Sequence, residues 1–285
     1  MTKSEKSAFS HSLSSTPTKK QLGNNQRCKN FIFAPQNHLQ GGHILNKAIV
    51  TENLSKKYKN NRGIQDINLE VDRGEIFGFL GPNGAGKTTA IKIMVGLMKP
   101  DKGNVRINGH DISDEYEKAM ENVGCVVENE VHFSYLTAYE NMKLRSRFYT
   151  DIDDAQIHKT LEIVGLIKYK NEKIKNYSLG MKQRFGIAIA ILSNPDTIIL
   201  DEPFNGLDVE GMVQMRKLIL GLSKEKNTTF FISSHLIHDV ELVCDRVGVI
   251  HGGKLLATDN TQDVLKNYSS LENYYLSEVD LSGNC

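Results

Sequence analysis

Apolar residues recur with two different periods along this chain, and the change of period predicts where strands and helices lie. Short apolar runs and two-residue alternation predict strands at 48–53, 64–71, 75–80, 105–108, 197–200, 229–233 and 247–251. Apolar positions spaced as on one face of a helix predict helices at 87–98, 138–148, 155–164, 179–192, 211–224 and 236–243. The order of these segments predicts an α/β core that is interrupted by a helical insert at about 134–195.

Composition separates the first 46 residues from the rest of the 285-residue chain. Ser, Thr, Asn and Gln dominate this stretch, and no apolar periodicity runs through it. Residues 1–47 carry seven basic side chains and one acidic side chain, Glu5, so the remainder is mildly acidic although the formal net charge is +1. We therefore expect a disordered basic polar extension at 1–46, a globular domain at 47–267 and a short polar tail at 268–285.

The charge and hydropathy of residues 48–285 argue against two classes of protein, those that bind nucleic acid and those that span a membrane. A mildly acidic surface argues against nucleic-acid binding as the main activity. The longest strongly apolar run, at 185–192, is far shorter than the roughly 20 residues that a membrane-spanning helix needs. A role at a membrane would therefore depend on a partner that supplies the spanning segments.

A glycine-rich segment with phosphate-binding spacing follows the strand predicted at 75–80. It matches the pattern G-x-x-x-x-G-K-[ST] in full, and the helix predicted at 87–98 starts directly after it. The glycines allow backbone N–H groups to surround phosphate oxygens, Lys87 reaches the β- and γ-phosphates, and the Thr88 hydroxyl suits Mg²⁺. We expect this phosphate-binding loop to hold ATP through Gly81, Pro82, Asn83, Gly84, Ala85, Gly86, Lys87, Thr88 and Thr89.

A second segment, which ends in two acidic residues, completes the expected chemistry. Residues 197–202 read Thr-Ile-Ile-Leu-Asp-Glu, which is a buried strand that ends in two carboxylates. Asp201 is placed to support Mg²⁺, and Glu202 is placed to polarise the water that attacks the nucleotide. Together the two segments predict an enzyme that hydrolyses ATP.

Four further segments resemble motifs of the ABC-transporter ATPases. Residues 178–184 (Ser-Leu-Gly-Met-Lys-Gln-Arg) resemble the family's signature motif, and 205–208 (Asn-Gly-Leu-Asp) resemble its D-loop. The run Ser-Ser-His that ends at His235 resembles its switch histidine, and Tyr58 lies where its adenine-stacking aromatic lies. The resemblance covers about 48–266, with the motifs in the family's order and spacing.

This resemblance implies a fold and a set of roles. The fold is a P-loop NTPase core with an antiparallel β subdomain and a helical insert. Tyr58 would stack on adenine, Glu202 would be the general base, and His235 would join Lys87 at the γ-phosphate. Asp208 belongs to the D-loop.

The resemblance also implies partners. Ser178 and Gly180 would reach the nucleotide held by an opposite subunit, so this single ATPase domain would pair as a homodimer or with another ABC ATPase domain. A separately encoded transmembrane permease would hold the pair at the cytoplasmic face of the cell membrane.

Two departures from the family pattern are informative. Tyr177, Leu179 and Met181 replace Leu, Gly and Gln of the common signature Leu-Ser-Gly-Gly-Gln, whereas Ser178 and Gly180 remain. Glu128 replaces the usual glutamine of the Q-loop.

The stretch around Glu128 resembles the bacitracin-exporter and lantibiotic-immunity subgroup, which carries Glu at this position but a Pro where Glu130 lies here. A carboxylate there would be an anionic ligand of Mg²⁺. The alternative is a drifted Q-loop position without meaning for transport.

We therefore expect the ATPase subunit of an exporter that removes a peptide antibiotic, for resistance or self-immunity. One alternative is another ABC exporter, for a drug, lipid or polysaccharide. A sugar importer would often carry a long C-terminal regulatory domain, which the short tail does not supply. A non-transport ABC protein would show a second ATPase unit, long coiled coils or zinc-binding cysteine clusters, and the sequence has none of these.

Overall fold

The computed structural model describes residues 46–59, 62–128 and 132–283. The extension expected at 1–46 therefore lies, apart from Asn46, outside the described residues. Within the described ranges, no helix combines the length and apolarity that crossing a membrane requires.

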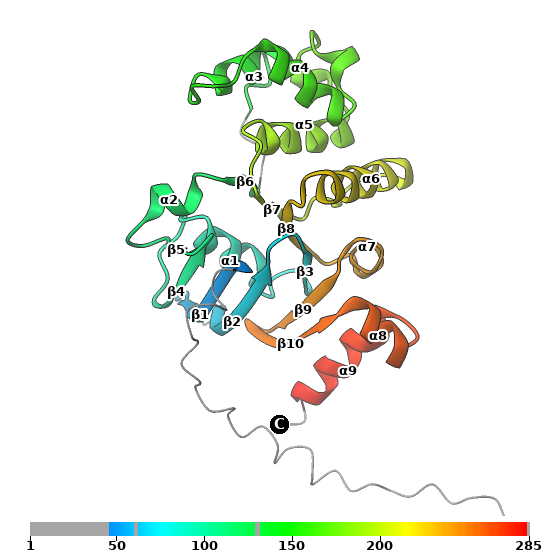
Figure 1. The fold of residues 1–285 in the computed structure, drawn as a ribbon. Coiled ribbons are helices and arrows are strands. Elements are labelled where there is room, and N and C mark those ends of the chain that lie inside the picture. Colours follow the sequence, from blue (N-terminus) through cyan, green and yellow to red (C-terminus); the bar gives the residue numbers. More distant parts are fainter. Residues whose placement is uncertain (1–45, 60–61, 129–131, 284–285) are drawn as a thin grey trace, which may run out of the picture. The chain divides into compact units, whose positions relative to one another are not determined.

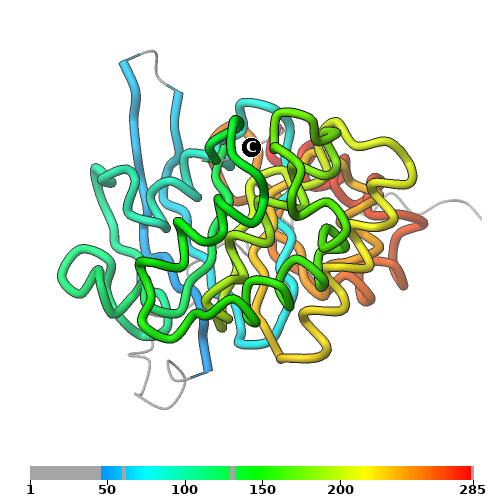
Figure 2. The backbone as a smooth tube through the Cα atoms, turned by 90° about the horizontal axis from the view of Figure 1, so that it is seen from above, coloured from blue at the N-terminus to red at the C-terminus, as the bar shows by residue number. Residues whose placement is uncertain are grey.

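One sheet of the domain has four strands, in the order β2-β1-β4-β5, and all of its pairings are antiparallel. β1 is central, so Thr51 lies opposite Leu69 on one side and Val105 on the other. Figure 2 shows the β1–β2 hairpin (blue) projecting at one side of the domain. The strands are β1 (Lys47–Lys57), β2 (Gly63–Asp72), β4 (Lys102–Ile107) and β5 (His110–Asp111).

The other sheet has six strands, in the order β10-β9-β3-β8-β7-β6, and only its β9–β10 pair is antiparallel among the described strands. Both β3 and β8 are buried along their whole length, as expected for central strands of a parallel sheet with near-continuous apolar runs. The strands are β3 (Ile76–Leu80), β6 (Val123–Val126), β7 (Thr197–Asp201), β8 (Thr229–Ser234), β9 (Arg246–His251) and β10 (Lys254–Asn260).

Helices connect the parallel strands and form the insert. Figure 1 shows α3, α4 and α5 together at the top of the view, away from the antiparallel sheet. These three helices fall inside the range expected for the insert. The helices are α1 (Lys87–Met94), α2 (Tyr116–Met120), α3 (Ala138–Ser146), α4 (Asp154–Ile163), α5 (Leu179–Ile191), α6 (Val209–Lys226), α7 (Ile237–Val243), α8 (Thr261–Asn267) and α9 (Leu271–Gly283).

The core consists of two apolar clusters on the two faces of the parallel sheet. Side chains of a strand alternate between faces, so Phe77 and Phe79 of β3 belong to one cluster, whereas Ile76 and Leu80 belong to the other. The Phe77 ring stacks on Phe231 of β8, with 5.7 Å between the ring centroids. This packing holds the end of β3, and with it the loop that starts at Gly81.

The structure corrects two expectations about helices. The helix expected at 87–98 ends at Met94, because Gly96 adopts a left-handed φ of +73° and closes the helix. The expected polar tail at 268–285 contains helix α9, with Leu271 and Tyr274 buried. The helix packs against α7, α8, β9 and β10.

Candidate active site

A cavity of about 370 Å³ opens between the β1–β2 hairpin and the start of α1. The hairpin, the glycine-rich loop and the residue after β7 all contribute to its wall. The lining residues are Tyr58, Arg62, Gly63, Asn83, Gly84, Gly86, Lys87, Thr88, Thr89 and Glu202. Six of the nine residues expected in the phosphate-binding loop or directly after it thus line, with Tyr58 and Glu202, one cavity.

The glycine-rich loop has the backbone of a phosphate cradle. Gly84 and Gly86 adopt φ values of +83° and +109°, which side chains with a Cβ rarely tolerate. An added Cβ at Gly84 would meet no atom within 4 Å, so this part of the loop faces open space. Because the first N–H groups of α1 have no partner inside the helix, they are available to an anion at the loop.

Lys87 is a buried cation at the base of the cavity. Only 5% of its side chain is exposed, and its Nζ donates to the carbonyl oxygens of Gly81 at 2.7 Å and Pro82 at 3.1 Å. The same Nζ lies 3.0 Å from Oε1 of Glu202. An ammonium group held by these three acceptors is placed to neutralise a phosphate in the cavity.

Two oxygen ligands suitable for Mg²⁺ lie side by side. The Thr88 hydroxyl donates to Oδ2 of Asp201 at 2.8 Å, and the Ser233 hydroxyl donates to Oδ1 of the same carboxylate at 2.5 Å. Among the described residues no group of three or more His, Cys, Asp or Glu side chains could hold a metal ion by itself. This donor set fits Mg²⁺, which binds through one or two carboxylates and takes its other ligands from water and substrate phosphates.

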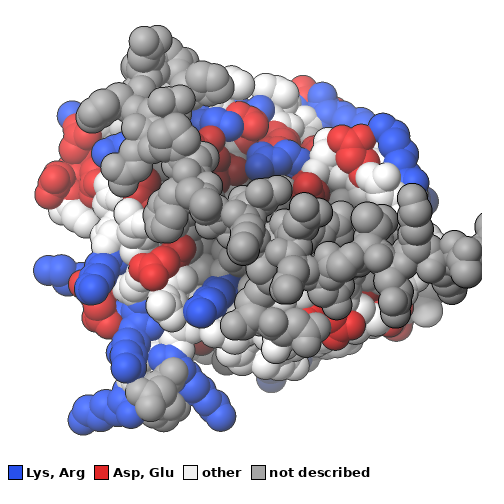
Figure 3. Space-filling view, turned by 90° about the horizontal axis from the view of Figure 1, so that it is seen from below, with Lys and Arg blue, Asp and Glu red and all other residues white. Residues whose placement is uncertain are grey.

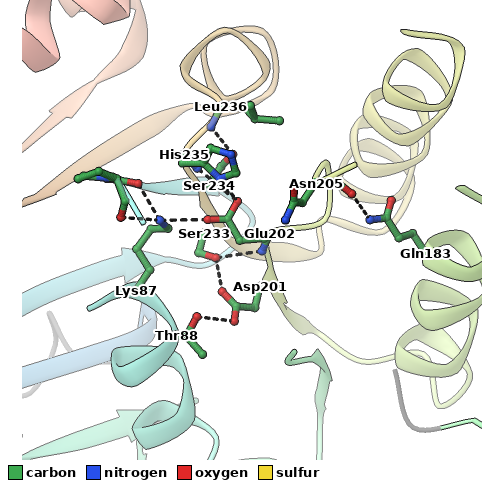
Figure 4. A network of polar contacts seen from close by, with 12 residues as sticks. Lys87, Thr88, Gln183, Asp201, Glu202, Asn205, Ser233, Ser234, His235 and Leu236 are labelled. Atoms are coloured by element: carbon green, nitrogen blue, oxygen red, sulfur yellow. Dashed lines mark hydrogen bonds and ion pairs between the residues drawn. The ribbon is translucent and has the colours of Figure 1, made fainter. Parts of the chain in front are cut away.

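Glu202 contacts both Lys87 and His235. Its Oε2 lies 2.8 Å from Nδ1 of His235, and its Oε1 lies 3.0 Å from Nζ of Lys87 (Figure 4). Its backbone N–H donates to the Ser233 hydroxyl at 3.0 Å, in a conformation with φ +52° that is uncommon for a residue with a Cβ. A carboxylate in this position can accept a proton from a water molecule that enters the cavity.

Tyr58 and the end of the hairpin border the mouth of the cavity. The Tyr58 hydroxyl donates to Sδ of Met98 at 3.1 Å, and 37% of the residue is exposed, so a face of the ring is available to a planar ligand. The hairpin end is basic, with Lys56, Lys57, Lys59 and Arg62 close in sequence, and Lys and Arg side chains gather at the lower left of Figure 3. This charge favours a polyanionic ligand.

The residues expected to act in trans lie outside this cavity. Ser178 is exposed at the first turn of α5, where its Oγ accepts a hydrogen bond from the N–H of Met181 at 3.2 Å. Asp208 starts α6 in the same way and accepts from the N–H of Gly211 at 2.8 Å. Neither these two residues nor Gly180 lines the cavity.

Glu128 is also absent from the cavity wall. Its Oε1 lies 2.5 Å from Nζ of Lys92, and its side chain is 56% exposed. Its backbone has a φ of +56°, in the left-handed region. The structure thus gives this carboxylate a lysine partner, and its role as a ligand of Mg²⁺ stays a prediction.

Sequence reasoning missed Ser233 as a site residue. This serine lies opposite Asp201 in the pairing of β7 with β8, and it contacts both that carboxylate and the N–H of Glu202. It is the first residue of the Ser-Ser-His run, so the signal was present. Only the register of the two strands shows which of the two serines faces the site.

Comparisons with known proteins agree with this geometry. A family model described as ABC transporter matches residues 64–205. Bacitracin transport ATP-binding protein BcrA of Enterococcus faecalis is 41% identical over 239 residues, which are 84% of this chain and 76% of that protein. Lantibiotic transport ATP-binding protein SrtF of Streptococcus pyogenes is 33% identical over 222 residues, which are 76% of this chain and 95% of that protein.

A solved structure has the same fold. It is a dimeric post-hydrolysis state of the ATP-binding cassette MJ0796 bound to ADP and Pi, and it matches with a TM-score of 0.67 and 25% identity. The match covers 75% of this chain and 98% of that one.

Proposed function

This chain belongs to the ABC transporter family, as an ATP-binding and ATP-hydrolysing subunit, and from that membership we propose that it drives export of a peptide antibiotic. The single observation that carries hydrolysis is the position of Glu202, whose carboxylate contacts Lys87 on one side and His235 on the other.

In the proposed reaction, Glu202 takes a proton from water as the water oxygen bonds to the γ-phosphorus of ATP. The bond between that phosphorus and the leaving ADP oxygen breaks in the same step. Lys87 and the N–H groups at the start of α1 neutralise the phosphates, and Tyr58 stacks on adenine. Thr88 and Asp201 would hold Mg²⁺, which supplies further neutralisation of phosphate charge.

The antibiotic substrate is supported by the relatives and by Glu128. BcrA and SrtF are described as transport ATP-binding proteins for bacitracin and for a lantibiotic, which are both peptide antibiotics. Glu128 stands where this subgroup carries Glu in place of the usual Q-loop glutamine. Another exporter, for a drug, lipid or polysaccharide, is the alternative.

The proposed partners are a second ATPase domain and a membrane permease at the cytoplasmic face of the membrane. Exposure of Ser178 and its absence from the chain's own cavity support a contact with the nucleotide of another subunit. The matching cassette MJ0796 is described as dimeric, which supports the same arrangement.

The test compares wild type with Glu202→Gln in antibiotic-sensitive cells that also express the cognate membrane subunits. The wild-type chain should raise tolerance to bacitracin or a lantibiotic but not to an unrelated small drug. Glu202→Gln should abolish the gain while ATP binding persists, because the cradle is unchanged. If purified wild type hydrolyses ATP through Glu202 yet gives no peptide tolerance, the exporter alternative replaces the peptide substrate.

A further inference from the structure

The first turns of α5 pack directly against residues 202–208, which connect β7 to α6. Nε2 of Gln183 donates to the backbone carbonyl of Asn205 at 2.6 Å (Figure 4). Leu179 lies so close to Gly206 that a Cβ built there would be 2.8 Å from its Cδ2. The helix and the connection therefore meet through a hydrogen bond and a close apolar contact.

A second apolar contact runs in the opposite direction. A Cβ added to Gly180 would lie 3.3 Å from Cδ2 of Leu207. Each segment thus presents a leucine to a glycine of the other, so a shift of either one changes the position of its neighbour.

Within residues 202–208, one hydrogen-bonded turn links Asn205 to Glu202, which carries the catalytic carboxylate. The N–H of Asn205 donates to the carbonyl of Glu202 at 3.1 Å, so the residue that Gln183 binds is hydrogen-bonded to the residue that carries the base. Glu202 has the uncommon φ of +52°, and such a conformation persists only where the surroundings hold it in place. The anchor at Asn205 is one such constraint.

The orientation of the Gln183 amide follows from its partner. Because the Asn205 atom is a carbonyl oxygen, which only accepts, the amide nitrogen must face it. Oε1 of Gln183 is buried and makes no hydrogen bond to any described residue. The amide is therefore held on the connection through its nitrogen.

From these contacts we infer that Gln183 is a positioning residue for Glu202: it ties the helix that carries the signature residues to the connection that carries the general base. The inference rests on the proposed hydrolysis at Glu202. A displacement of α5, whose first turn carries Ser178, is passed through Asn205 to the carboxylate.

The experiment uses the full chain and measures ATP hydrolysis, ADP affinity and melting temperature. Gln183→Met keeps the length of the side chain but removes the donor, and Gln183→Glu keeps the shape and places an acceptor against the Asn205 carbonyl. Gln214→Met is the matched control, because that glutamine donates to Glu210 on its own helix and, among the described residues, makes no hydrogen bond to Asn205 or Glu202. Loss of one hydrogen bond predicts a fall in kcat of about three- to tenfold in both Gln183 variants.

The decisive measurement repeats the substitution in a Glu202→Gln background. If Gln183 acts through Glu202, Gln183→Met should leave the residual rate of that background unchanged, because the two effects are not additive. ADP affinity and melting temperature should stay near wild type, as in Gln214→Met. An equal fall in both backgrounds, or wild-type kcat in both Gln183 variants, would overturn the inference. Wild-type hydrolysis by Glu202→Gln alone would overturn the general-base role as well.

Discussion

The imidazole of His235 and the carboxylate of Glu202 are hydrogen-bonded, with 2.8 Å between Nδ1 and Oε2. A carboxylate only accepts, so Nδ1 carries the proton and Nε2 is the nitrogen left for another contact. The backbone N–H of His235 donates to the same oxygen at 3.3 Å. His235 thus holds the carboxylate that we propose as the general base through two donors.

Replacing His235 tests which nitrogen matters. His235→Ala should lower kcat by about 10²-fold, because a well-placed catalytic group contributes on this scale, while ATP affinity stays close to wild type. His235→Asn places an amide donor near the former Nδ1 and should recover part of the loss. His235→Gln places its amide near the former Nε2, and steady-state kinetics should show less recovery. If Gln recovers more activity than Asn, the role of His235 lies in the Nε2 contact and not in orienting Glu202.

Glu128 tests the link between hydrolysis and transport. Glu128→Gln should lower hydrolysis only modestly, because the proposed Mg²⁺ ligands Thr88 and Asp201 are unchanged. Glu128→Ala should impair antibiotic tolerance in cells more than it impairs ATPase activity in vitro. Lys92→Met is a matched variant that removes the partner in the Glu128 ion pair and leaves the carboxylate. Wild-type behaviour of Glu128→Ala in both assays would make residue 128 a passive loop position.

Helix α9 should contribute to the stability of the domain. Leu271 is fully buried, so Leu271→Ala should lower the free energy of unfolding by about 2–5 kcal/mol. Leu276→Ala on the same helix is the control, since Leu276 is 50% exposed and its truncation should change stability by less than about 0.5 kcal/mol. Urea unfolding measures both variants. Equal effects of the two substitutions would contradict the packing of α9.

The carboxylate of Glu278 should make the stability of this region depend on pH. Burial, and then the charge of Asp259, raises its pKa above the usual 4.5. Because the pKa of Glu278 is higher in the folded state than in the unfolded state, the contribution of this residue to stability is present below pH 4.5. That contribution is lost as the pH rises through the pKa of the folded state. Glu278→Gln should therefore gain melting temperature relative to wild type between about pH 4 and pH 7.

The control for this pH dependence is Glu272→Gln, which changes an exposed carboxylate on the same helix. Thermal unfolding at several pH values measures both variants. A difference between Glu278→Gln and wild type that does not change with pH would contradict a raised pKa of Glu278.

Local sequence was sufficient for the fold class and for the elements that carry the chemistry. The strand at Ile76–Leu80, the glycine-rich loop and the helix that begins at Lys87 are encoded by contiguous residues, because apolar runs, glycines and helix-forming residues act over a few positions. The α/β class, with its antiparallel subdomain and helical insert, is confirmed. The same local reasoning missed α9, which packs against α7, β9 and β10, elements that precede it by more than ten residues in the sequence.

Only the tertiary structure decided which distant residues meet. Ser233 contacts Asp201 because β7 and β8 pair in parallel, and Gln183 contacts Asn205 because α5 packs on the connection after β7. Glu128 pairs with Lys92, a contact that motif spacing does not predict. Periodicity and motif spacing report which face or which end of an element a residue occupies. They carry no information on strand register or on the packing of one element against another, and those set the distances in this site.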